Sequence, residues 1–96
     1  MSDDKEPSAT KEQSAFYELA DQFINLANEL AKKEGSADVG TALRYAAARY
    51  NTFEASLSTN DLAADEGKMT DMLVNDFRDM LTVHMKDYIQ IIAKNK

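Results

Sequence analysis

Histidine is a common metal ligand and acid–base group, and this chain contains one, His84, with Asp87 three residues later. If the segment is helical, the two side chains lie on adjoining faces. Di-iron helical bundles use Glu-x-x-His pairs, of which this chain has none, and a metal site needs three or four protein ligands. We therefore interpret His84 as a structural histidine and expect no metal. The alternative is a metal-binding or acid–base role.

A second group of polar residues could bind a small polar ligand. Asp21, Asn25 and Asn28 follow one another at steps of four and three, which places them on one helical face. Arg49 flanks an apolar stripe, where its stem can be buried while its guanidinium seeks a carboxylate. We favour an ion pair between Arg49 and an acid such as Asp21, beside a solvated polar face, because partly buried charges are normally paired.

The acidic residues Asp61, Asp65 and Glu66 precede Gly67 as they might in a calcium-binding loop. That loop needs oxygen ligands at alternate positions before its glycine, and the first of these falls on Leu62. An acidic first helical turn accounts better for these charges. The sequence also lacks nucleophile motifs and phosphate-binding glycine loops, so we expect no catalytic residue and no cofactor.

The chain has 96 residues, enough for one domain, with no cysteine and a net charge of −6. Its basic residues are dispersed, which disfavours binding to nucleic acid or to anionic membrane surfaces. No apolar run approaches the roughly 20 residues needed to cross a bilayer. We expect a cytoplasmic protein, since a reducing compartment suits a chain without cysteine.

Apolar periodicity predicts three helices, over residues 11–34, 38–57 and 60–94. The first has a broad stripe: Phe16, Leu19, Ala20, Phe23, Ala27 and Leu30. The second has a narrower seam: Val39, Leu43, Ala46, Tyr50, Phe53 and Leu57. The third has a main stripe: Leu62, Met69, Leu73, Phe77, Met80, His84, Tyr88 and Ile91. We expect an all-α, three-helix antiparallel bundle with a long C-terminal helix.

Capping signals support these boundaries. Thr10 with Gln13 and Ser58 with Asp61 fit capping boxes that open the first and third helices. Gly35 can take the left-handed position that ends the first helix, and Ser36 or Asp38 can cap the second. A kink or break of the third helix is possible at Gly67.

The domain organisation follows from these elements. Residues 1–9 carry no periodicity and should form a disordered acidic tail, and residues 10–96 a single helical domain. We expect Phe23, Leu43 and Phe77 to be buried in one core shared by all three helices, because each lies near the middle of an apolar stripe.

The third helix has more apolar surface than one bundle can readily cover. Beside its main stripe runs a second ridge: Val74, Leu81, Met85 and Ile92. This ridge is rotated by about 100° from Leu73, at 100° per residue. A contiguous exposed apolar patch usually marks an interface, so we expect a homodimer or higher oligomer through the second ridge. In the alternative, the first helix covers this ridge within a monomer.

Three runs of sequence carry a family resemblance: FYELAD and INLANE over residues 16–21 and 24–29, ALRYAAARYN over 42–51, and FRDML followed by DYI over 77–81 and 87–89. Their order and spacing resemble a family of small bacterial proteins known as a domain of unknown function, family 3144. The resemblance covers nearly the whole chain after residue 9. It implies a compact helical domain and no known activity, substrate or catalytic residue.

The sequence therefore favours a small non-catalytic module for protein interaction or assembly, with an unknown protein partner. The alternative is a small-ligand or metal-binding helical protein that uses Asp21, Asn25, Asn28, Arg49 or His84.

Overall fold

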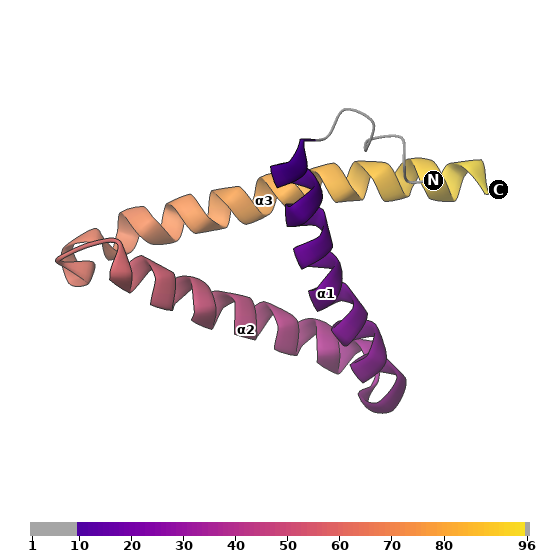
Figure 1. The fold of residues 1–96 in the computed structure, drawn as a ribbon, viewed down its shortest axis with the longest axis horizontal. Helices are drawn as coiled ribbons and strands as arrows, with labels where there is room; N and C mark the ends of the chain where they lie inside the picture. The colour runs from indigo at the N-terminus through magenta and orange to yellow at the C-terminus, as the bar shows by residue number, and fades with distance from the viewer. Residues whose placement is uncertain (1–9, 96) are drawn as a thin grey trace. The chain divides into compact units, whose positions relative to one another are not determined.

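The computed structural model describes residues 10–95, which form three α-helices and no strand: α1 (Lys11–Glu34), α2 (Ser36–Leu57) and α3 (Leu62–Lys94) (Figure 1). The predicted all-α class is confirmed for this part of the chain. Every predicted helix is present, and no boundary is displaced by more than two residues. The acidic tail predicted for residues 1–9 lies outside the described residues.

The predicted capping box at the start of α1 is confirmed. The Thr10 hydroxyl accepts a hydrogen bond of 3.0 Å from the backbone N–H of Gln13. In return, Oε1 of Gln13 accepts one of 2.8 Å from the backbone N–H of Thr10. Two backbone donors that the first helical turn leaves without partners are thereby satisfied.

Gly35 forms the junction between α1 and α2, with φ 92° and ψ 142°. The positive φ was predicted, but ψ lies outside the left-handed helical region. Its N–H donates to the carbonyl of Ala31 at 3.0 Å, and its own carbonyl accepts the N–H of Val39 at 3.3 Å. The prediction that Ser36 or Asp38 caps α2 is wrong, because both lie inside α2 and the carbonyl of Gly35 already accepts the first bond of that helix.

The connection between α2 and α3 also differs from the prediction. Ser58 does not cap α3; its hydroxyl donates to the carbonyl of Ala55 at 3.0 Å and so closes the end of α2. Asp61 caps α3 alone, since its Oδ1 accepts the N–H of Ala64 at 3.1 Å. α3 continues without a break through Gly67.

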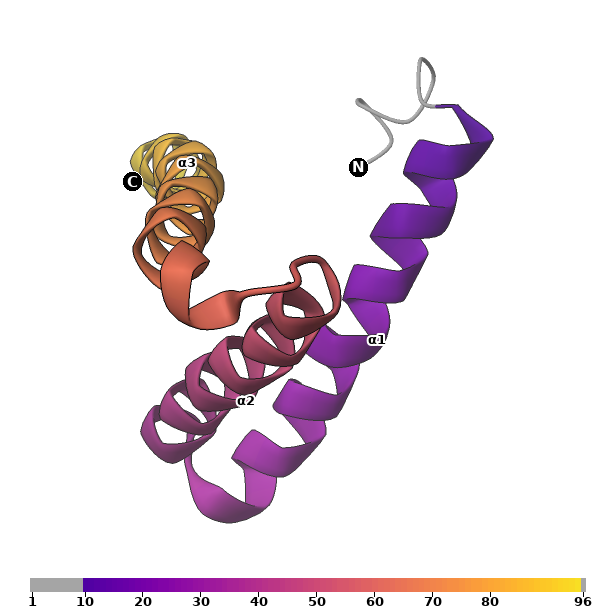
Figure 2. The ribbon, with the colours of Figure 1, turned by 90° about the vertical axis from the view of Figure 1, so that its left-hand side faces the viewer.

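The chain divides into two compact units between Ala47 and Ala48, in the middle of α2. The N-terminal unit contains α1 and the first half of α2; the C-terminal unit contains the second half of α2 and α3. Within each unit, two helices meet at their short connection and diverge away from it (Figures 1 and 2). Whether residues 10–96 form a single domain stays a prediction.

Partly buried side chains follow this arrangement. In the N-terminal unit, those near the connection are Ala27, Ala31, Val39 and Gly40. In the C-terminal unit, they are Asn51, Ala55, Thr59, Leu62, Asp65, Met69 and Leu73. Each helix pair therefore shields apolar surface mainly where its two helices meet.

None of the described side chains is fully buried, so neither unit by itself forms the core predicted around Phe23, Leu43 and Phe77. These three residues are 59%, 40% and 50% exposed. The physical reason is the number of neighbours. A buried core residue touches about 6 to 12 others, whereas a pair of helices shields each member on one side.

Candidate interaction surface

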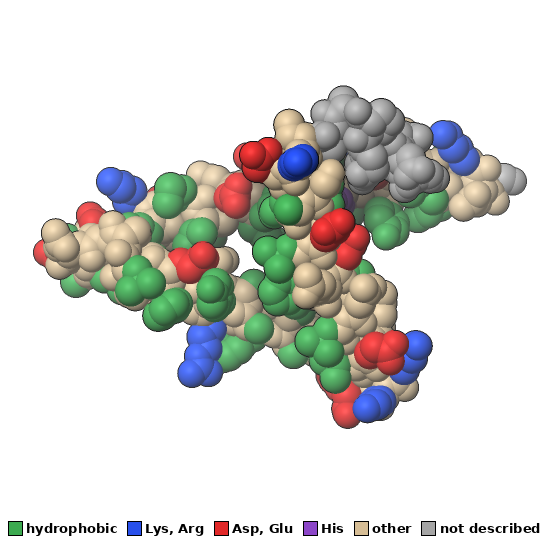
Figure 3. Space-filling view, viewed as in Figure 1, with side chains coloured by type: hydrophobic (Ala, Val, Ile, Leu, Met, Phe, Trp, Pro, Cys, Tyr) green, Lys and Arg blue, Asp and Glu red, His purple; other side chains and the backbone are tan. Residues whose placement is uncertain are grey.

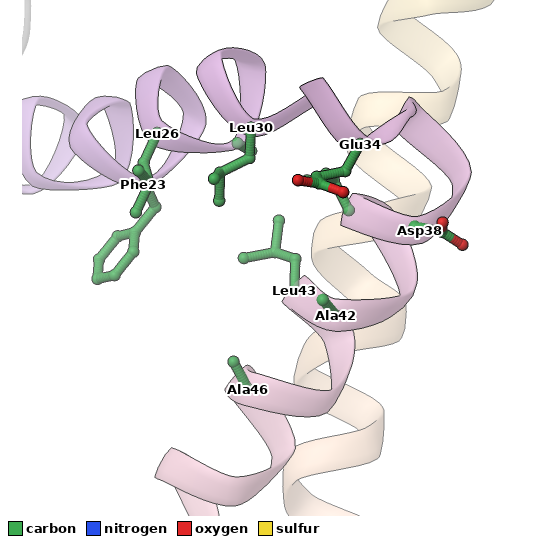
Figure 4. A pocket seen from close by; sticks show the side chains of 10 residues that line it. Phe23, Leu26, Leu30, Glu34, Asp38, Ala42, Leu43 and Ala46 are labelled. Atoms are coloured by element: carbon green, nitrogen blue, oxygen red, sulfur yellow. The ribbon is translucent and has the colours of Figure 1, made fainter. Parts of the chain in front are cut away.

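The N-terminal unit contains an apolar groove between α1 and the first half of α2, which we call the α1–α2 groove. Its volume is about 530 Å³. The lining residues are Phe23, Leu26, Ala27, Leu30, Glu34, Asp38, Val39, Ala42, Leu43 and Ala46. Leu30 and Leu43 point toward one another across it, and Ala42 and Ala46 contribute only methyl groups (Figure 4). The groove is thus wide enough to accept large apolar side chains from another element.

The charge in this groove is negative and lies at one end. The carboxylate of Glu34 lies between the two helices near their connection, whereas Asp38 points away from the groove (Figure 4). Among the described residues, the ion pair of this unit joins Lys32 to Glu29 at 3.4 Å, on the exposed surface. Glu34 forms no ion pair within that part of the chain, so its carboxylate is available to an external cation.

A second apolar surface runs along α3. Every side chain from Val74 to Lys94 is exposed, over about 30 Å at 1.5 Å per residue. The second ridge belongs to this surface: Val74, Leu81, Met85 and Ile92 are 49%, 42%, 57% and 55% exposed. The main stripe beyond Leu73 is exposed as well. Apolar side chains are visible on the surface of all three helices in Figure 3.

The residues of the predicted polar sites are exposed, and the sites themselves stay predictions. Asp21, Asn25 and Asn28 lie exposed on α1, as predicted for one helical face. Arg49 lies exposed on α2 and His84 on α3. Within each unit, the described residues show no hydrogen bond between any two members of this set. Residues 10–95 also contain no group of three or more His, Asp or Glu side chains that could hold a metal ion.

The α1–α2 groove was not predicted from the sequence, because two of its residues, Phe23 and Leu43, were expected in a closed core. The signal was present in the second helix, whose apolar seam carries Ala46 and is flanked by Ala42. Small residues on a helix face leave room for a third helix, whether it comes from the same chain or from another.

None of the three described helices has the length and apolar composition needed to cross a membrane.

Over its described residues this is a small all-helical protein with exposed apolar side chains on each helix. Residues 16–89 match the family described as "Protein of unknown function (DUF3144)", and the chain belongs to this family. The resemblance found in the three sequence runs is therefore confirmed. No curated protein and no solved structure gave a significant match.

Proposed function

We propose that the protein is a non-catalytic assembly module that associates with itself through α3 as a homodimer or higher oligomer. The observation that carries the proposal is the exposure of the whole second ridge. Single exposed apolar residues are normal on soluble proteins, but contiguous apolar patches usually mark interfaces. Val74, Leu81, Met85 and Ile92 are contiguous on one side of a continuous helix.

Self-association also supplies what the single chain lacks. Each unit by itself contains two helix segments, and a helical pair leaves most of its apolar surface in water. Removal of that surface from water would stabilise the assembly by roughly 25 cal/mol for each Å² of apolar area buried. Two-fold pairing of the second ridge with its own copy is the simplest closed arrangement. The proposal includes an antiparallel three-helix arrangement of each chain and a cytoplasmic location, which suits its acidic, cysteine-free composition.

The test is the molar mass by light scattering at micromolar concentration. We expect a mass of at least two chains for the wild type, and a mass of one chain for the double variant Leu81→Glu/Met85→Lys with helicity largely retained. The matched control is Thr82→Glu/Gln90→Lys, which makes the same charge changes on the polar side of α3. A wild-type mass of one chain would refute the proposal.

The second candidate is a small-ligand-binding protein. The observation in its favour is the α1–α2 groove, whose volume of about 530 Å³ is comparable to that of small-molecule sites. Native mass spectrometry with elemental analysis, on protein purified without an affinity tag, separates the candidates. A stoichiometric small molecule or metal on each chain would favour ligand binding over assembly.

A further inference from the structure

We draw no further inference here: the strongest candidate, the apolar α1–α2 groove of the N-terminal unit, carries none, because nothing in the structure shows what covers its walls.

Discussion

The hydroxyl of Thr59 donates a hydrogen bond of 2.5 Å to Oδ2 of Asp65, six residues later, at the connection between α2 and α3. The same hydroxyl oxygen accepts the backbone N–H of Asp61 at 3.0 Å. Both side chains are partly buried. Thr59 thus holds the turn before α3 in the geometry that lets Asp61 cap the helix.

Removal of this hydroxyl should destabilise the C-terminal unit. We expect Thr59→Ala to lower the free energy of unfolding by about 1 kcal/mol, because the carboxylate of Asp65 loses its donor. Ser58→Ala is the control and should change stability by much less, since the Ser58 hydroxyl bonds only to a carbonyl at the exposed end of α2. Urea denaturation at one fixed protein concentration measures both. Equal effects of the two substitutions would contradict the role assigned to Thr59.

Replacement of Gly35 and of Gly67 by alanine should change the free energy of unfolding in opposite directions. Gly35→Ala should destabilise by about 1 kcal/mol or more, because a side chain disfavours positive φ although no atom lies within 4 Å of the added Cβ. Gly67→Ala should stabilise by up to about 1 kcal/mol, since alanine is the better helix former and the added Cβ meets open space. Thermal unfolding of each variant gives the sign. A destabilising Gly67→Ala would mean that a neighbouring chain packs against this position.

If the protein self-associates, its melting temperature should rise with concentration. Association that requires the folded chain shifts the unfolding equilibrium by mass action. We therefore expect the wild type to melt at a higher temperature at roughly 100 µM protein than at roughly 1 µM. These two concentrations span a micromolar dissociation constant. Leu81→Glu/Met85→Lys should remove most of this dependence. A wild-type melting temperature independent of concentration over that range would argue against reversible self-association.

Zinc or iron should leave thermal stability nearly unchanged. His84 and Asp87 offer one imidazole and one carboxylate, fewer than the three or four protein ligands of a typical site. Binding with a dissociation constant 100-fold below the free metal concentration would stabilise by about 2.7 kcal/mol. Thermal unfolding with and without added metal measures this stabilisation. A stabilisation of that size that disappears in His84→Ala would contradict the prediction.

The amino-acid sequence by itself determined the three helices and much of their boundaries. Helix formation and capping depend on neighbours within about four residues, so the Thr10–Gln13 box and the positive φ of Gly35 could be predicted from residue types and spacing. The cap of α3 was the exception. Ser58 and Asp61 have the spacing of a capping box, but the bond between Thr59 and Asp65 shapes the turn so that Asp61 caps alone.

The tertiary structure decided which apolar faces are covered. A stripe of apolar residues indicates that a helix has a face to bury, but the same stripe suits a core, a groove or an interface between chains. Phe23 and Leu43 were expected inside a core and instead line the α1–α2 groove, and Phe77 is half exposed on α3. The reason is that burial depends on contacts between residues distant in the sequence, and helical periodicity does not specify which helix, or which chain, provides them.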